Sequence, residues 1–417
     1  MFSDSPHGHS GRPVRSFARN MNSINIRPPP LSLYVHLPWC ESKCPYCDFN
    51  SHPLRQKLPE DDYLDALLVD LRQEKDVFQD RPVQSIFIGG GTPSLFSPAA
   101  VHRLLDAIRE IAEFVQQTEI TLEANPGAAE INRFTGYLEA GVNRLSLGIQ
   151  SFSDKKLRSL GRIHDASQAR HAISAAQNAG FTNLNIDLMF GLPDQNEKGA
   201  LNDLTIALGY APSHLSLYQL TIEPNTYFAI NPPALPDEET DWRIRNILYD
   251  SVKTAGYHRY EVSAFSKPGA QCSHNLSVWR FGDYVGLGAG AHGKITTSQG
   301  ITRYAKEKHP NRYMEKARSN FVLTDPRTIS SEDLCFEFML NALRLSDGFL
   351  PSEFTERTGV PWSVLTRPLN DARRRGLLET DGGRVRATKL GYRFLDDLVE
   401  LFLPKVELHT APPTGTS

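Results

Sequence analysis

Residues 34–50 read Tyr-Val-His-Leu-Pro-Trp-Cys-Glu-Ser-Lys-Cys-Pro-Tyr-Cys-Asp-Phe-Asn, and they contain three of the chain's five cysteines, Cys40, Cys44 and Cys47. Thiolate is the protein ligand that iron–sulfur clusters require, and a C-x3-C-x2-C loop can fold three thiolates around one face of a cluster. Three thiolates leave one iron of a [4Fe–4S] cluster without a protein ligand, so that iron can bind a small chelating molecule. The spacing therefore predicts a reactive cluster held by these three cysteines.

Other interpretations of the cysteines are a disulfide framework and a zinc site. A disulfide framework needs an oxidising compartment and usually an even number of cysteines, and neither condition is supported by this sequence. A structural zinc site needs a fourth ligand, which His36 or His52 could supply, although zinc motifs usually come as two separated ligand pairs. A zinc-stapled scaffold without redox chemistry stays open as an alternative.

Length and charge set broad limits on the protein. A chain of 417 residues exceeds the size that one core usually organises, so we expect a large domain and a smaller one. The formal net charge is −3, from interspersed acidic and basic side chains, which does not favour a nucleic-acid partner. We find no apolar run long enough for a membrane span and no secretory signal after the N-terminal arginines. We therefore expect a cytoplasmic protein, in a reducing compartment that preserves thiolates.

Most of the chain alternates short apolar runs with amphipathic segments, the pattern of repeated βα units in a parallel sheet. The predicted strands are residues 31–37, 83–88, 119–124, 143–149, 183–189 and 214–220. Helical spacing marks residues 64–71, 101–114, 167–179 and 199–208 between them. This predicts an α/β fold, a partial (β/α)6 TIM-like barrel.

The barrel and the loop region that follows it are predicted over residues 31–325, after a disordered extension at 1–30. Residues 257–265 read as a further strand. We expect residues 326–405 to form a small α-rich domain. It has helical patterns at 334–345, 361–377 and 390–402 and a possible short strand at 384–386. Its helix-turn pattern is similar to a winged helix, and a disordered tail at 406–417 follows.

Polar or glycine residues stand where several predicted strands end. In barrels of this kind the chemistry sits at the carboxyl ends of the strands, so we expect these residues to share one site: Gly90, Gly91, Thr92, Glu123, Gln150 and Asp187. Arg162 could bind a ligand carboxylate, since a guanidinium matches it with two hydrogen bonds. The alternatives are a plain turn for the glycines, a salt bridge or a helix cap for the polar residues at the strand ends, and an ordinary surface position for Arg162.

The cysteine loop resembles the signature of the radical SAM superfamily, C-x3-C-x-aromatic-C, with Tyr46 in the aromatic place. The resemblance implies a radical SAM barrel in which S-adenosylmethionine chelates the open iron. It also implies an electron donor if S-adenosylmethionine is cleaved to a 5′-deoxyadenosyl radical.

Four further motifs resemble the oxygen-independent coproporphyrinogen III oxidase-like group, over residues 31 to about 400. They read Gly-Gly-Gly-Thr-Pro, Glu-Ala-Asn-Pro, Arg-Leu-Ser-Leu-Gly-Ile-Gln-Ser-Phe and Asp-Leu-Met-Phe-Gly-Leu-Pro. This resemblance implies S-adenosylmethionine contacts at Tyr34, Gly90, Gly91, Thr92, Glu123, Gln150, Arg162 and Asp187. No catalytic residue is predicted.

One position separates two branches of that group. The oxidase branch has a further cysteine two places after the last cluster ligand, where this chain has Phe49. The sequence Cys-Pro-Tyr-Cys-Asp-Phe-Asn-Ser instead resembles the haem chaperone branch, HemW, which implies haem as cargo and an unknown haem-acceptor protein. The His274-Asn275-x3-Trp279 pattern resembles that branch too and makes His274 a candidate haem ligand; a hydrogen-bonded core histidine is the alternative.

Overall fold

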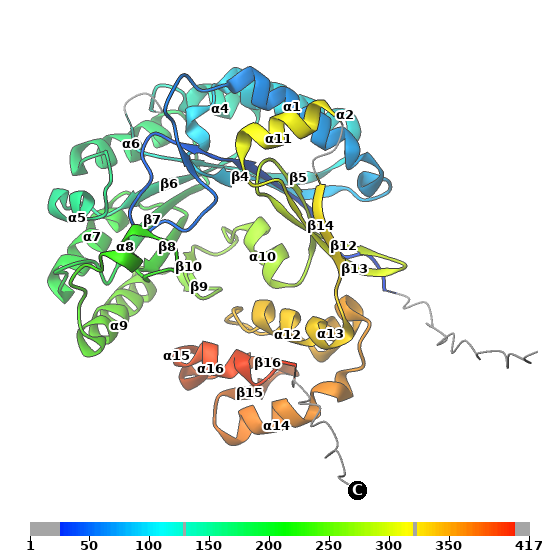
Figure 1. Cartoon of the computed structure of the whole chain (residues 1–417). Helices are drawn as coiled ribbons and strands as arrows, with labels where there is room; N and C mark the ends of the chain where they lie inside the picture. Colours follow the sequence, from blue (N-terminus) through cyan, green and yellow to red (C-terminus); the bar gives the residue numbers. More distant parts are fainter. Residues whose placement is uncertain (1–25, 128–130, 320–322, 405–417) are drawn as a thin grey trace, which may run out of the picture.

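The computed structural model describes residues 26–127, 131–319 and 323–404, and within them one curved, 12-stranded sheet organises the molecule (Figure 1). Its centre consists of parallel neighbours that follow one another in sequence order, as the alternating pattern predicts. These strands are β1 (Leu31–Leu37), β4 (Val83–Gly90), β5 (Phe114–Ala124), β6 (Arg144–Gln150), β7 (Leu184–Phe190) and β8 (His214–Gln219). The sheet remains open in the part of the chain that is described, so the barrel is partial.

Helices cover the convex face of this sheet in Figure 1. They are α1 (Glu60–Gln73), α2 (Pro98–Ile111), α4 (Phe134–Ala140), α6 (Ala166–Asn178), α7 (Glu197–Gly209) and α9 (Glu238–Thr254), with the short α5 (Asp154–Ser159). The short α8 (Tyr227–Ile230) instead lies against the cysteine loop, where the Phe228 N–H donates to the Pro45 carbonyl at 3.0 Å. Local sequence fixes where they start: the Ser97 hydroxyl caps α2, and Asp165 with Gln168 forms a capping box at α6. Their apolar faces and the central strands form the main core.

Both edges of the parallel sheet are extended by strands that the sequence patterns did not predict in this form. At one edge β11 (Asp283–Leu287) pairs parallel with β1, and β12 (His292–Thr297), β13 (Gly300–Lys306) and β14 (Leu323–Thr328) continue antiparallel. At the other edge, residues 257–265 do not form one strand. They bend between β9 (His258–Arg259) and β10 (Ala264–Ser266), which pairs antiparallel with β8.

The remaining short elements of this part lie beside the sheet. They are β2 (Trp39–Cys40), β3 (His52–Pro53), η1 (Lys75–Phe78), η2 (Pro93–Leu95), α10 (Ser273–Trp279) and α11 (Pro310–Arg318). In Figure 1 helix α10 lies on the concave side of the sheet. No helix among the described residues is both long and apolar enough to cross a membrane.

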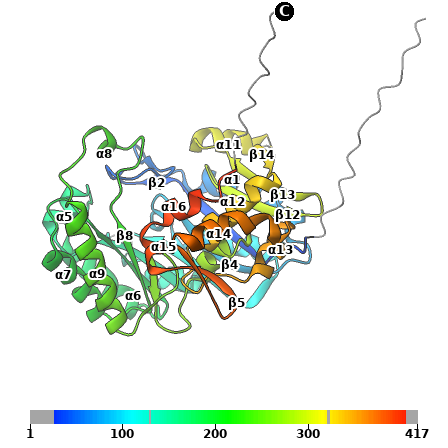
Figure 2. The same cartoon turned by 90° about the horizontal axis from the view of Figure 1, so that it is seen from below.

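The C-terminal elements surround a second apolar cluster, in which the rings of Phe338, Phe349 and Phe354 meet edge to face. The elements are α12 (Ser331–Ala342), α13 (Pro351–Thr358), η3 (Trp362–Leu365), α14 (Thr366–Arg374), β15 (Leu378–Asp381), β16 (Arg384–Ala387), α15 (Lys389–Arg393) and α16 (Leu395–Glu400). Helices followed by the β15–β16 hairpin give the winged-helix order. This layer lies below the sheet in Figure 1 and in front of it in Figure 2.

Several predicted boundaries were wrong. The helix predicted over residues 101–114 ends at Ile111, because β5 already begins at Phe114. The predicted helix at 390–402 is interrupted at Phe394, whose backbone leaves helical geometry. Residues 26–30 belong to the folded part rather than to a disordered extension: Ile26 is buried in the second apolar cluster. The predicted disorder of residues 1–25 and 406–417 lies outside the described residues.

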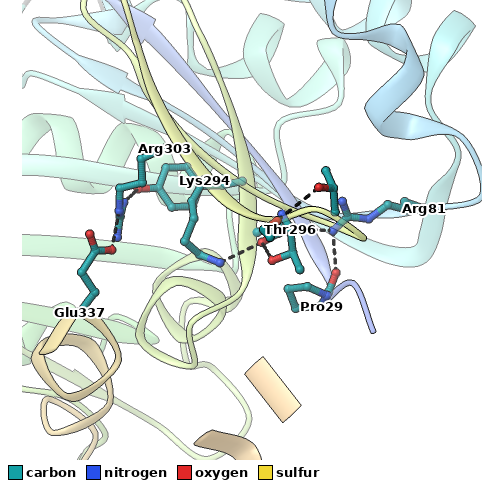
Figure 3. A network of polar contacts seen from close by, with 10 residues as sticks. Pro29, Arg81, Lys294, Thr296, Arg303 and Glu337 are labelled. Atoms are coloured by element: carbon teal, nitrogen blue, oxygen red, sulfur yellow. Dashed lines mark hydrogen bonds and ion pairs between the residues drawn. The ribbon is translucent and has the colours of Figure 1, made fainter. Parts of the chain in front are cut away.

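A buried carboxylate ties the edge extension to the barrel (Figure 3). Asp283 on β11 accepts hydrogen bonds from the buried Lys294 ammonium at 2.8 Å and from Arg81 at 2.8 Å. The Thr296 N–H and hydroxyl donate to the same carboxylate at 2.7 and 2.8 Å. Arg81 also donates to the Pro29 carbonyl at 2.8 Å. Loss of one donor therefore leaves a buried charge with fewer partners.

We expect Lys294→Met, which keeps most of the side-chain volume, to lower the free energy of unfolding by about 3–5 kcal/mol, the usual cost of breaking a buried ion pair. Urea unfolding measures it. Arg103→Ala, which removes the exposed pair with Asp65, is the matched control and should cost less than about 1 kcal/mol. Equal effects of the two substitutions would show that the Asp283 network does not stabilise the fold.

Candidate functional site

The cysteine loop rests on the glycine loop through backbone hydrogen bonds. The Gly91 N–H donates to the Leu37 carbonyl at 2.8 Å, and the Thr92 N–H donates to the Trp39 carbonyl at 2.7 Å. A Cβ atom at Gly91 would lie 2.5 Å from the Trp39 carbonyl oxygen, closer than any side chain can approach. Gly90 has φ +116°, and a Cβ there would meet the His36 ring at 2.7 Å. Glycine is therefore required at both positions for the two loops to meet.

The thiols of Cys40, Cys44 and Cys47 line one cavity of about 670 Å³ at the carboxyl ends of the central strands. Burial raises the pKa of Cys40, and the charges of the other two thiols raise it further. A hydrogen bond with Thr92 acts in the opposite direction. The Arg162 guanidinium lies 3.7 Å from the Cys44 sulfur. Three thiols that share one space beside a cation fit the ligand set of a cluster.

Neither candidate for a fourth zinc ligand lines the cavity that the thiols share. Both ring nitrogens of His36 have partners: Nδ1 lies 2.9 Å from the Tyr34 hydroxyl, and Nε2 lies 2.9 Å from the Asn50 carbonyl. The His52 ring packs edge to face against His309, with centroids 5.5 Å apart, and its buried Nε2 has no hydrogen-bond partner among the described residues. The arrangement therefore does not place either histidine in the cavity with the thiols.

Two carboxyl groups reach the same cavity from neighbouring strand ends. The pKa of Glu123 is raised to about 8, mainly by burial and secondly by the charge of Asp187. The Gly90 N–H, which donates to Glu123 Oε2 at 3.2 Å, opposes this increase. Burial also raises the pKa of Asp187, opposed by hydrogen bonds from Asn185 at 2.8 Å and Ser146 at 3.1 Å. Glu123 therefore holds a proton at neutral pH and can donate as well as accept a hydrogen bond.

Gln150 and Arg162 form the wall of the cavity beside the cysteine loop. Gln150 ends β6 with φ +67°, a left-handed conformation that is uncommon for residues other than glycine and typical of ligand sites. The Arg162 guanidinium donates to Asn125 Oδ1 at 2.7 Å and to the Gly148 carbonyl at 2.9 Å. These bonds aim the arginine at the cysteine end of the cavity.

All of the predicted site residues line this cavity except Tyr34 and His274. Tyr34 donates to or accepts from His36 Nδ1 at 2.9 Å, and burial raises its pKa, with the Glu123 charge as the second cause. His274 is buried on α10, with Nδ1 3.2 Å from the Ser85 hydroxyl and its ring 5.1 Å from that of Phe87. The pKa of His274 is lowered to about 3, mainly by burial and secondly by the charge of Arg144.

The cavity also contains residues that sequence reasoning missed. Asn125 directly follows a predicted strand and Tyr218 lies near the end of another, so their positions could have identified them. Arg344 reaches the cavity from the C-terminal layer. It had no local signal, because only the tertiary fold brings residues after α12 to the strand ends.

Comparison with known proteins identifies related sequences and related structures. The family model of the radical SAM superfamily matches residues 34–204, and that of the HemN C-terminal domain matches residues 329–394. The chain is 47% identical over 380 residues to the heme chaperone HemW of Haemophilus influenzae, covering 90% of this chain and 98% of that protein. It is 48% identical over 379 residues to the heme chaperone HemW of Escherichia coli, covering 91% and 99%.

Among solved structures, coproporphyrinogen III oxidase (HemN) from Escherichia coli, a radical SAM enzyme, superposes with a TM-score of 0.76 at 23% identity. The match covers 91% of this chain and 92% of that one. This likeness confirms the predicted fold, and the sequence matches confirm the predicted resemblance.

We expect Glu123→Gln to reduce the pH dependence of stability. Below its ordinary pKa of 4.5 both states hold the proton; between pH 4.5 and about 8 only the folded state holds it, so stability falls as pH rises. Without added ligand, the loss of unfolding free energy between pH 5 and 8 should be smaller in the variant by about 2–4 kcal/mol. Glu110→Gln, at an exposed carboxylate on α2, is the control. Parallel pH profiles for wild type and Glu123→Gln would refute the raised pKa.

Proposed function

Because the chain belongs to the HemW family, the haem chaperone branch of the radical SAM superfamily, we propose that it binds haem and passes it to an acceptor protein. In this proposal it carries a [4Fe–4S] cluster and S-adenosylmethionine. The observation that carries the proposal is its identity, over almost their full length, to proteins named as heme chaperones. The cavity at the strand ends supports the cofactor part.

Cys40, Cys44 and Cys47 would hold the cluster. When bound, the cluster supplies an electron to a ligand on its open iron, and the electron comes from a donor protein if S-adenosylmethionine is cleaved. The chain also places the Arg162 cation 3.7 Å from the Cys44 sulfur, where its charge would offset the negative charge of a bound cluster.

S-adenosylmethionine would lie between the glycine loop and the strand ends. Gly90 and Gly91 let the backbone border the cavity without side chains, which leaves room for the amino acid part of the ligand. Protonated Glu123 can hydrogen-bond to the ligand without adding a buried charge. Arg162 supplies the cation for a carboxylate.

The haem part of the proposal rests on the family and on His274. Burial keeps this imidazole neutral, which is the form that coordinates iron. The rings of Tyr34 and Phe87 pack against it, so haem reaches His274 only if these rings or α10 move. Phe49 lines the cavity and is 65% exposed. A phenyl ring thus stands where the oxidase branch has a thiol, which favours the chaperone over the oxidase.

We expect Cys44→Ala to lose most of its iron and sulfide after anaerobic reconstitution, because a thiolate ligand is removed. Cys335→Ala is the matched control: its thiol is buried in α12, away from the cavity, so the variant should retain the wild-type iron and sulfide content. A full complement in Cys44→Ala would refute the ligand assignment. Zinc without iron in the reconstituted wild type would instead establish the zinc-stapled scaffold.

Haemin added to the anaerobic protein should give a saturable shift of the Soret band. His274→Ala should weaken binding by at least the roughly 10–100-fold that loss of a metal's outer-shell partner costs, while His171→Ala, on the exposed face of α6, should bind as wild type does. We expect no decarboxylation of coproporphyrinogen III. Carbon dioxide release with 5′-deoxyadenosine in proportion would establish the oxidase and end the chaperone proposal.

A further inference from the structure

Arg344 is contributed to the cavity by the C-terminal layer. It follows helix α12, and the chain contacts the barrel both before and after this arginine in the sequence. Glu337 on α12 pairs with Arg303 on β13 at 2.6 Å (Figure 3), and the Ser346 N–H donates to the Tyr260 carbonyl at 3.0 Å. The Arg344 carbonyl accepts from the Tyr392 hydroxyl at 3.0 Å. The backbone that carries this arginine is therefore fixed.

The side chain of Arg344 is positioned by two further contacts. Its guanidinium carbon lies 4.2 Å above the Trp279 ring of α10, a stacking that favours a planar cation. Its Nη2 lies 3.3 Å from Glu261 Oε2, and the Glu261 side chain is only 4% exposed. The guanidinium thus lies beside α10, whereas Arg162 lies beside Cys44.

The hydrogen-bonding capacity of Arg344 is not used up by these contacts. A guanidinium has five N–H donors, and the contact with Glu261 is a single, long one. Within the described residues, neither Arg344 Nε nor the stacked Trp279 Nε1 has an acceptor, and both atoms are buried. Buried donors without acceptors are costly, so this end of the cavity favours a ligand that brings anionic oxygens.

Two carboxylate ligands come into question for this position. The carboxylate of S-adenosylmethionine has to lie near the cysteines if that molecule chelates the open iron, and Arg162 already serves that end. The propionates of haem extend from the edge of the macrocycle and can reach a second, separate cation. Because Arg162 lies beside Cys44 and Arg344 beside Trp279 and Glu261, the propionate is the carboxylate that suits Arg344.

We propose that Arg344 is a specificity-determining residue of the cargo site, which binds a propionate carboxylate of the tetrapyrrole. This inference rests on the proposed function as a haem chaperone. It also gives the C-terminal layer a role in that function, because the layer supplies the recognition group while the barrel supplies the cofactor residues.

The test compares haemin with haemin dimethyl ester, whose propionates are uncharged, by Soret titration of the anaerobic, reconstituted protein. Wild type should bind haemin roughly 10–100-fold more tightly than the ester. This is the change in affinity that loss of a hydrogen bond to a charged group produces. Arg344→Gln should bind the two ligands about equally, because its haemin affinity falls to that of the ester. Arg344→Lys keeps the charge without the planar fork and should retain part of the preference.

Arg374→Gln, at an exposed arginine of the C-terminal layer that pairs with Asp371, is the matched control. It should preserve the wild-type preference, and thermal unfolding shows whether each variant is folded. Equal loss of preference in Arg374→Gln and Arg344→Gln would mean that the effect is not specific to Arg344 and would overturn the proposal. A wild-type preference in Arg344→Gln would overturn the proposal, although haem binding itself would still stand.

Calorimetry with S-adenosylmethionine is a second measurement on the same variant. If Arg344→Gln weakens the binding of S-adenosylmethionine, the carboxylate at Arg344 belongs to that molecule and the proposal fails. Absence of haem binding in the wild type would refute the proposed function itself.

Discussion

The site depends on the close contact between the cysteine loop and the glycine loop. The parallel register of β1 with β4 places Leu37 beside Gly90. Backbone hydrogen bonds from Gly91 and Thr92 then hold the cysteine loop against the carboxyl end of β4. This contact tolerates no side chain at Gly91. Because the remaining central strands are parallel to β4, their carboxyl ends open on the same space, and the polar groups on them converge there.

The concave side of the sheet combines contributions from the whole chain. The barrel brings the thiols and the carboxyl groups of Glu123 and Asp187, and α10 brings His274 and Trp279. The C-terminal layer brings Arg344, and it is joined to β13 and to the bend between β9 and β10 by buried or half-buried ion pairs. Arg162 beside Cys44 and Arg344 beside α10 both line one cavity. The proposed cofactor and the proposed cargo each bring a carboxylate that could pair with one of these arginines.

Much of the fold and site could be predicted from local sequence. The period of apolar residues indicated the central strands within a few residues, and the cysteine spacing and the strand-end positions indicated residues that share the cavity. Three features could not be predicted. The edge strands β11 to β14 contain buried polar residues such as Lys294, which only their partners across the sheet explain. Residues 257–265 bend where the sheet needs two short strands. The position of Arg344 depends on packing between distant parts of the chain.

The central claim is that three thiolates hold a cluster whose remaining iron faces the ligand cavity. Mössbauer spectroscopy of protein reconstituted with ⁵⁷Fe, with and without S-adenosylmethionine, tests it most directly. A single iron subsite should change its isomer shift and quadrupole splitting when S-adenosylmethionine is added, because only that iron lacks a thiolate. Identical spectra with and without a saturating concentration of the ligand would contradict the account.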